Sequence, residues 1–390
     1  MSSIGIAVVG CGYWGPNLIR NFARVRGGQL VALCDRDSAR LEAAGRDHPT
    51  VLRVPEFDAL LEDASVDAVV IATSAATHHR LAKKALLSGK HVYIEKPMCL
   101  RAVDAADLVA TAARQGRRLM VGHLLEYHPA VEFLKGYIEA GHLGDVRYVY
   151  SQRLNLGQVR HDENALWSLG PHDIAIANFL LAERPLEVCA LGQSYLQSGI
   201  QDVVFLTIKY PGEKLAHIHV SWLDPHKTRK LTVVGSSQMA VFDDMEPAEK
   251  IRLYDKGVDL PPEACDDPAA GMKLRFGDIS IPHLPGGEPL LAECQHFVDC
   301  IRDGCTPRSD GLDGLRVVQV LEAAERSLRE GGRPVTIDEY AEGETGRWAM
   351  GDGAMGDGAM GRPDTRRPTP DTRRPTPDAP SSAREPLEVR

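Results

Sequence analysis

The chain has 390 residues, of which 43 % are hydrophobic and 25 % charged, and its formal net charge at pH 7 is −9. This length is enough for two ordinary domains, each with its own core. The acidic balance argues against a general nucleic-acid binder, and no run of about 18 apolar residues predicts a membrane span. The first residues lack a basic flank, so we expect no signal peptide, and the eight cysteines form no C-x-x-C pair. These features predict a cytoplasmic protein with reduced thiols.

Short apolar runs alternate with helical stretches in the first third of the chain. Strands that alternate with helices predict an α/β domain, a doubly wound parallel sheet with helices on both faces. The runs are apolar throughout, which is typical of strands that are covered on both sides. The expected strands are Ile4–Val9, Leu30–Cys34, Val51–Val54, Ala68–Ala72, His91–Ile94 and Arg118–Val121. We place this domain at residues 1–123.

The pattern changes after residue 123. Several strand-like segments with short turns predict an α+β domain over residues 124–345, with an open, mainly antiparallel sheet. Two late helices are expected to pack back near the first domain. From residue 346 the repeats GDGAM and PDTRRPT have almost no apolar surface, so residues 346–390 are predicted to be a disordered low-complexity tail or, alternatively, a docking peptide. The expected segments are helices at 129–141, 171–182, 290–304 and 314–332, and extended runs at 145–157, 186–196, 202–210, 214–222, 230–236 and 239–244.

A glycine-rich loop follows the first expected strand. Gly10, Gly12 and Gly15 satisfy G-x-G-x-x-G, in which the glycines permit a tight turn, the approach of a diphosphate, and close packing of the next helix. Asp35 lies at the end of the second strand, where a carboxylate accepts hydrogen bonds from the adenine ribose and repels a 2′-phosphate. The pattern predicts a Rossmann domain that binds NAD in preference to NADP. Arg36, beside the acid, is suited to a phosphate or to stacking on adenine.

A lysine lies where the fifth strand ends, in HVYIEKPM. Ligands of open parallel sheets bind at the carboxyl ends of the strands, so Lys96 is expected to reach the nicotinamide side of the cleft and to stabilise negative charge on a substrate oxygen. Glu95 is expected to orient this lysine or to bind the nicotinamide ribose. The predicted cofactor contacts are Gly10, Gly12, Tyr13, Trp14, Gly15, Asp35, Arg36, Thr73, His78, Glu95 and Lys96.

The loop GCGYWG, the acid at Asp35 and the EKP of residues 95–97 together resemble the Gfo/Idh/MocA oxidoreductases, over about residues 4–335. The resemblance implies a Rossmann domain, a C-terminal domain whose open sheet faces the cofactor, and sugar or cyclitol substrates. It also implies a D-x-x-x-H motif, whose histidine matches His172 and whose aspartate is replaced by Ser168; Asp173 is a possible substitute. We expect His172 to be the general base and Lys96 to polarise the hydroxyl oxygen, and the reverse assignment stays open.

A polar segment precedes this motif, and its residues suit a sugar and a diphosphate. The combination is similar to the branch of the family that acts on nucleotide sugars, such as UDP-N-acetylglucosamine 3-dehydrogenases; the alternative is an exposed strand edge with solvated arginines. The segment after the sixth strand, with Glu126, Tyr127 and His128, is placed at the cleft by the same resemblance. No spacing typical of zinc ligands appears, so we predict no metal. The predicted substrate contacts are Tyr127, Arg153, Asn155, Arg160, Asn164 and His172.

The sequence therefore predicts an NAD-dependent oxidoreductase that oxidises a secondary hydroxyl, at C3″ of a UDP-N-acetylhexosamine, to a ketone that feeds amino-sugar biosynthesis. Three alternatives stay open: a ketosugar reductase, a dehydrogenase of inositol or simple sugars, and a dinucleotide-binding sugar sensor without turnover. The partners expected are the small-molecule substrate and further copies of the chain in a homodimer or homotetramer, with no nucleic acid or membrane.

Overall fold

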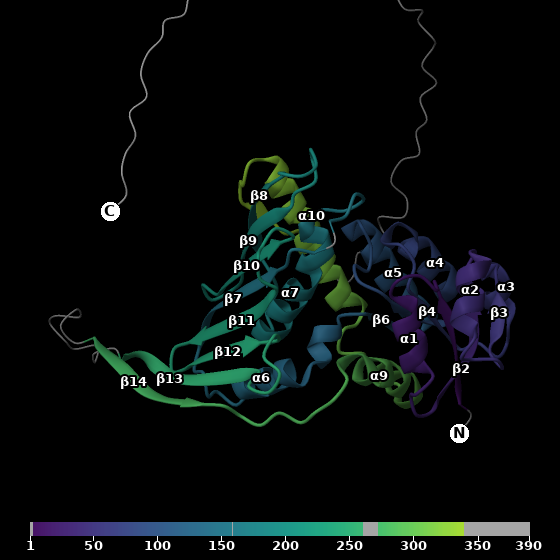
Figure 1. Ribbon diagram of the computed structural model, residues 1–390, viewed down its shortest axis with the longest axis horizontal. Coiled ribbons are helices and arrows are strands. Elements are labelled where there is room, and N and C mark those ends of the chain that lie inside the picture. Colours follow the sequence, from purple (N-terminus) through teal and green to yellow (C-terminus); the bar gives the residue numbers. More distant parts are fainter. Residues whose placement is uncertain (1–2, 158, 260–271, 339–390) are drawn as a thin grey trace, which may run out of the picture. The chain divides into compact units, whose positions relative to one another are not determined.

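The structure, a computed structural model, describes residues 3–157, 159–259 and 272–338 (Figure 1). The predicted tail at residues 346–390 lies outside the described residues. The cysteines that the structure describes are free thiols, and most of them are buried. None of the described helices is both long and apolar enough to cross a bilayer.

The N-terminal part forms a six-stranded parallel sheet in the order β3-β2-β1-β4-β5-β6. The predicted doubly wound sheet is confirmed, and each strand lies within two residues of its expected bounds. The strands are β1 (Ile4–Val9), β2 (Gly28–Cys34), β3 (Leu52–Val54), β4 (Ala68–Ile71), β5 (His91–Ile94) and β6 (Leu119–Val121). The helices are α1 (Gly15–Phe22), α2 (Ser38–Gly45), α3 (Phe57–Glu62), α4 (Ala75–Leu87) and α5 (Ala102–Gln115).

The strand order reverses beside β1, because the chain passes from β1 outward to β2 and β3 and then returns to β4 on the other side. At such a switch point the two loops after β1 and β4 diverge and leave a crevice at the carboxyl ends of the strands, where ligands of this fold bind. The glycine loop follows β1 directly, so the topology places it at this crevice.

The C-terminal part is built on a nine-stranded sheet in the order β14-β13-β12-β11-β7-β10-β9-β8-β15. Among the described strands, β7 and β10 form its one parallel pair, so the expected mainly antiparallel sheet is confirmed. The strands are β7 (Val146–Leu154), β8 (Glu187–Gln193), β9 (Val203–Lys209), β10 (Leu215–Ser221), β11 (Thr228–Gly235), β12 (Met239–Asp243), β13 (Ile251–Asp259), β14 (Lys273–Ser280) and β15 (Val335–Thr336).

Helices cover one face of this sheet. Helices α6 (Pro129–Glu139), α7 (Ala165–Leu181) and α10 (Gly311–Arg329) contact its strands, and the short 3-10 helix η1 (Leu124–Tyr127) packs against α6 and α7. Helix α9 (Pro289–Asp303) lies instead against α1 and η1. The alternating burial along β7, β9 and β10 sends one set of apolar side chains into this layer. The opposite face of the described sheet exposes large apolar side chains, among them Tyr148, Leu191 and Phe205.

The two late helices pack as expected. Helix α9 lies against α1 (Figure 1), and Phe297 on α9 meets Phe22 and Tyr93 edge to face, with ring centroids 6.3 and 5.8 Å apart. Helix α10 packs against α5 on one side and against α7 and β8 on the other. The last elements of the described chain thus complete the core of the first sheet and hold α7 in place.

Candidate active site

The glycine loop between β1 and α1 is shaped by two of its three glycines. Gly10 has a φ of +97°, which L side chains rarely adopt, and a Cβ there would lie 2.7 Å from the Ala72 backbone. A Cβ on Gly15 would lie 2.1 Å from the carbonyl oxygen of Gly10. Both positions are therefore needed by the fold itself. A Cβ on Gly12 would meet one atom of the described chain, an Arg40 guanidinium nitrogen at 3.4 Å, so the backbone there is open to a ligand.

We expect Gly12→Val to leave the fold intact and to weaken NAD binding. Space exists at this position, so the melting temperature should change by no more than about 3 °C. The added methyl groups would occupy the approach of the diphosphate, which should raise the dissociation constant of NAD at least about tenfold. Thermal unfolding and isothermal titration with NAD measure the two effects, with Gly136→Ala, at an open position of α6, as the control. Unchanged NAD affinity would contradict a cofactor role for this loop.

Asp35 follows β2 and folds against the glycine loop. One oxygen of its carboxylate accepts the Cys11 backbone N–H at 2.7 Å and the other accepts the Asp37 N–H at 2.9 Å. These bonds fix the carboxylate beside the loop, as recognition of a ribose requires. Arg36 and Tyr13 are exposed next to it. The open backbone at Gly12, the start of α1 at Gly15 and this carboxylate fit a dinucleotide.

Thr73 and His78, two of the predicted cofactor contacts, lie in the loop and the helix after β4. His78 is buried, with its Nδ1 2.9 Å from the Pro97 carbonyl oxygen and its Nε2 3.1 Å from the Thr73 carbonyl oxygen. It therefore ties together the loops that follow β4 and β5, and both its ring nitrogens are engaged within the protein. The Thr73 hydroxyl lies 2.7 Å from the Thr77 hydroxyl and is partly exposed.

Lys96 joins the two halves of the chain. Its Nζ donates a hydrogen bond of 3.0 Å to the backbone carbonyl of Ser168 in α7. Ser168, which stands at the aspartate position of the D-x-x-x-H motif, thus accepts this hydrogen bond through its backbone oxygen. Burial lowers the pKa of the Lys96 ammonium, against the opposing effect of Glu95. Burial likewise raises the pKa of the neighbouring Glu95 carboxyl to about 7. Because both groups are buried, small changes in their surroundings alter the charge that each carries.

His172 lies one turn beyond Ser168 on the same helix. Burial, followed by the positive charges of Lys96 and Arg153, holds the pKa of His172 well below its usual range, so its imidazole is neutral at pH 7. The sequence places this histidine at the start of a helix, and here the structure differs. Helix α7 begins at Ala165, because the Asn164 side chain caps it by accepting the Trp167 N–H at 3.1 Å. Pro171 is accommodated inside the helix.

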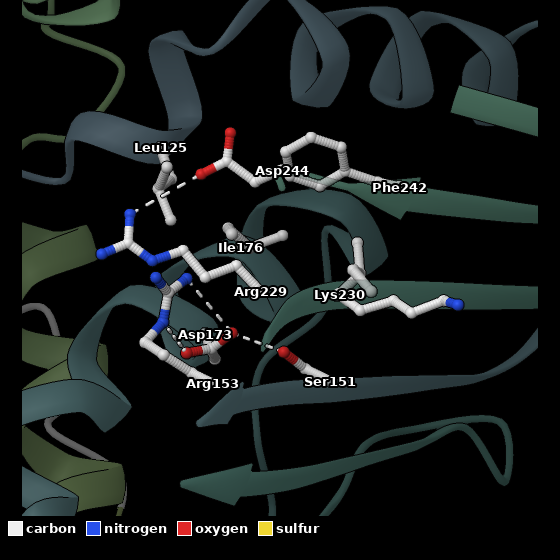
Figure 2. A pocket seen from close by; sticks show the side chains of 10 residues that line it. Leu125, Ser151, Arg153, Asp173, Ile176, Arg229, Lys230, Phe242 and Asp244 are labelled. Atoms are coloured by element: carbon white, nitrogen blue, oxygen red, sulfur yellow. Dashed lines mark hydrogen bonds and ion pairs between the residues drawn. The ribbon is translucent and has the colours of Figure 1, made fainter. Parts of the chain in front are cut away.

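The Asp173 carboxylate points toward Arg153 and Ser151 (Figure 2). It accepts the Arg153 Nε–H at 2.5 Å and also the Ser151 hydroxyl of β7. Asp173 is therefore not a substitute for the aspartate that is missing at position 168. The ion pair forms one wall of a pocket, which Arg229 and Asp244, 3.7 Å apart, complete on the other side.

Comparison with known proteins identifies the family. The oxidoreductase family with an NAD-binding Rossmann fold, Gfo/Idh/MocA, matches residues 4–123, and its C-terminal domain matches residues 131–241. The chain belongs to the Gfo/Idh/MocA oxidoreductases. It is 26 % identical to the D-apiose dehydrogenase of Paraburkholderia graminis over 83 % of this chain and 88 % of that protein. It is equally identical to the scyllo-inositol 2-dehydrogenase (NAD(+)) of Bacillus subtilis, over 85 % and 96 %.

A third relative is similar to this chain both in sequence and in its solved structure. The UDP-N-acetylglucosamine 3-dehydrogenase of Acidithiobacillus ferrooxidans is 26 % identical over 83 % of this chain and 97 % of its own length. Its structure superposes with a TM-score of 0.71, covering 85 % of this chain and 99 % of that one, at 23 % identity. Family membership thus makes the chain an oxidoreductase with an NAD-binding Rossmann domain.

Within this Gfo/Idh/MocA oxidoreductase the predicted substrate residues divide into two groups. Arg153 is paired with Asp173, and Arg160 pairs with Glu163 at 3.0 Å. Asn155 follows β7 and is partly exposed. Two other predicted contacts have partners within the protein: the Asn164 side chain caps α7, and Tyr127 is 3 % exposed, with its hydroxyl 3.0 Å from that of Ser309. Their contact with a substrate stays a prediction.

Three polar residues of this region were not predicted from the sequence. Arg229 and Asp244 line the pocket beside Arg153, and Asp313 on α10 contacts His123 directly after β6. Arg229 and Asp244 lie on β11 and just after β12, where alternation alone does not distinguish a pocket residue from a solvated one. Asp313 is separated from His123 by 190 residues, and no local pattern connects them.

Proposed function

We propose that this oxidoreductase transfers hydride from a secondary hydroxyl of a sugar to NAD, with His172 as the base and Lys96 on the hydroxyl oxygen. The observation that carries the proposal is the bond from Lys96 to the Ser168 carbonyl. It brings the lysine from the cofactor domain and the histidine from the second domain within one helical turn of each other, at the carboxyl end of β5. NAD, when bound, supplies the hydride acceptor.

The charges of the two side chains suit these roles. His172 is neutral, so its imidazole can accept the hydroxyl proton. In its protonated form, Lys96 would donate a hydrogen bond that stabilises negative charge on the oxygen as that proton leaves. In this site the lysine turns from the Ser168 carbonyl to the substrate oxygen. The opposite direction, reduction of a ketosugar, uses the same two groups.

The cofactor is proposed to be NAD. The Asp35 carboxylate is held beside the loop by two backbone N–H groups, where it suits two free ribose hydroxyls and opposes a 2′-phosphate. We expect NAD to be preferred over NADP at least about tenfold, equivalent to about 1.4 kcal/mol. Arg36 is exposed beside Asp35 and acts against this preference.

The substrate is proposed to be a UDP-N-acetylhexosamine, oxidised at C3″. Support comes from the cationic side chains around the cleft, Arg153, Arg160 and Arg229, which suit a diphosphate. The similarity to the Acidithiobacillus enzyme over nearly its whole length agrees with this choice. One observation favours a second candidate, a free cyclitol or simple sugar: Arg153 and Arg160 are already paired with Asp173 and Glu163, which reduces the positive charge offered to a diphosphate.

A substrate panel tests these proposals. Purified protein is mixed with NAD or NADP and with UDP-N-acetylglucosamine, UDP-N-acetylgalactosamine, dTDP- and GDP-sugars, or free inositol, and NADH absorbance is followed. We expect turnover with a UDP-N-acetylhexosamine and NAD. Turnover with inositol alone would overturn the nucleotide-sugar assignment. Tight NAD binding with no oxidation of any compound would overturn the enzymatic role and favour a sugar sensor.

A further inference from the structure

Two thiols meet where α9 ends, in a part of the molecule that the proposed reaction does not use. The Cys305 thiol donates to the sulfur of Cys300, and the two Sγ atoms lie 3.1 Å apart. Both residues are free cysteines, of which Cys300 is buried and Cys305 is exposed. A disulfide bond is about 2.05 Å long, so the two sulfurs are only about 1 Å farther apart than bonded sulfurs.

The contact between the two thiols follows from the local sequence, CIRDGC. Gly304 ends α9 in the left-handed conformation, with a φ of +73°, and so reverses the direction of the chain. The residue after such a glycine commonly packs on the helical residue five positions before it. Cys305 and Cys300 have this spacing, so the turn itself holds the exposed sulfur against the buried one.

A histidine completes the surroundings of the buried thiol. His296 lies one turn before Cys300 on α9, and its Nε2 is 3.4 Å from the Cys300 Sγ. The same Nε2 accepts the backbone N–H of Arg308 at 3.0 Å, so this nitrogen carries a lone pair and can accept the Cys300 S–H. The two thiols and the imidazole therefore form a short hydrogen-bonded chain that ends at the exposed Cys305.

The two thiols differ in access and in ionisation. Burial and the hydrogen bond from Cys305 raise the pKa of the Cys300 thiol to about 12, so Cys300 is protonated at pH 7. Cys305 is open to solvent and is the sulfur that a small reagent reaches first. An accessible thiol next to a second, resolving thiol is the typical arrangement of a redox-sensitive pair.

We propose that Cys305 and Cys300 form a redox modification site, which a small disulfide such as glutathione disulfide converts to an intramolecular disulfide. The Cys305 thiolate attacks one sulfur of glutathione disulfide, whose S–S bond breaks, and the glutathione thiolate that leaves takes up the proton from Cys305. Cys300 then attacks the Cys305 sulfur of the mixed disulfide and expels the second glutathione, which takes up the proton from Cys300. Two protein thiols are oxidised, and one glutathione disulfide is reduced to two thiols.

The new bond would fasten the end of α9 to the segment that leads into α10. Cys300 is held in the helix, so the movement of about 1 Å falls to Cys305, which lies outside it. The same segment is anchored a few residues later, where Arg308 donates to the Glu126 carbonyl at 2.6 Å and the Ser309 hydroxyl to the Val121 carbonyl at 2.7 Å. The disulfide would therefore link α9 to a segment bound to η1 and β6.

Peptide mapping of the full-length protein tests the proposal. The protein is incubated with or without glutathione disulfide, its remaining thiols are alkylated, and it is digested with trypsin and analysed by mass spectrometry without reduction. Trypsin cuts after Arg302 and so separates the two cysteines into peptides 276–302 and 303–308. We expect glutathione disulfide to join these peptides with loss of both thiols, and dithiothreitol to release them. The untreated protein should give the two peptides separately.

Three variants, each checked by circular dichroism, assign the roles of the two sulfurs. In Cys300→Ala we expect Cys305 to stop at the mixed disulfide with glutathione, because the resolving thiol is gone. In Cys305→Ser, a change at an exposed position, we expect Cys300 to stay reduced. The control is Cys189→Ser, which changes a partly exposed thiol that donates instead to the Gly332 carbonyl at 3.0 Å. This control should form the cross-link as wild type does.

Three results would overturn the proposal. The first is wild-type protein that carries glutathione on Cys305 without any cross-link, since Cys300 would then not resolve the mixed disulfide. The second is a cross-link that persists in Cys300→Ala, which would assign the bond to Cys294 on the same peptide. The third is Zn²⁺ that copurifies with the reduced protein and is lost from Cys305→Ser, which would indicate a metal site. The mapping requires no substrate, so its outcome is independent of whether the proposed sugar oxidation is found.

Discussion

Lys96→Ala is expected to lower kcat for NADH formation by about 10²- to 10⁴-fold, with the NAD dissociation constant changed less than about threefold. The loss follows because alanine removes the hydrogen-bond donor that would stabilise negative charge on the reacting oxygen, an effect of this size when one such donor is deleted. The fold should tolerate the change, because many other packing contacts hold β5 and α7 in place besides the bond from Lys96 to Ser168. Stopped-flow or steady-state NADH absorbance, with calorimetry for NAD, measures both quantities.

The control for this variant is Lys83→Ala, which removes a lysine of α4 whose Nζ lies 2.9 Å from Asp107 on the neighbouring helix. It should keep full turnover. Rescue of Lys96→Ala by an added small alkylamine would show that the missing group is the ammonium itself. Full activity of Lys96→Ala would remove the lysine from the mechanism. A parallel loss of NAD affinity would assign it to cofactor binding instead.

Asp173→Ala is expected to destabilise the protein by about 3–5 kcal/mol, the typical effect of breaking a buried ion pair. The exposed side-chain fractions of Asp173 and Arg153 are 3 % and 10 %, so alanine leaves the guanidinium buried without its anion. It also leaves the Ser151 hydroxyl without its acceptor. Urea unfolding followed by circular dichroism gives the difference in free energy.

The comparison variants make this result specific. Glu187→Ala breaks an ion pair with Lys209 at the surface, where the exposed fractions are 30 % and 58 %, and it should cost less than about 1 kcal/mol. Asp173→Leu with Arg153→Met removes both charges and should recover most of the stability. If Asp173→Ala cost no more than the surface variant, Arg153 would be free of this pair and available to a substrate phosphate.

The features that the sequence predicted correctly are local in the chain. The turn, helix and acid around Gly10 and Asp35 lie within some thirty residues, and their chemistry is set by backbone geometry and one carboxylate. The apolar strands of the first sheet are likewise readable, because burial on both faces leaves no polar positions. The start of α7 was missed since its cap, Asn164, lies in a polar stretch that resembles a loop, with Pro171 obscuring the helical pattern.

Features that depend on residues far apart in the sequence could not be predicted from the sequence. Asp173 stood next to the matched histidine in sequence, yet helical geometry points adjacent side chains in different directions, and its partner Arg153 lies on β7. Strands β13 and β14 were not predicted, because β14 is almost wholly exposed and β13 buries only Ile251 and Leu253, so neither shows apolar alternation along its whole length. The pairing of His123 with Asp313 depends on where α10 returns, which only the tertiary structure decides.

The packing of α9 has a consequence for the integrity of the cofactor domain. The core beneath the first sheet includes Phe22 and Tyr93, and it is closed by Leu290, Phe297 and Val298, which are synthesised some 170 residues after β6. A fragment cut after residue 123 would leave those two aromatic rings facing water, so the part that matches the family's dinucleotide module is not expected to persist as an independent unit. During synthesis, the first sheet leaves the ribosome well before α9, so its core stays incomplete until nearly the whole described chain has been made.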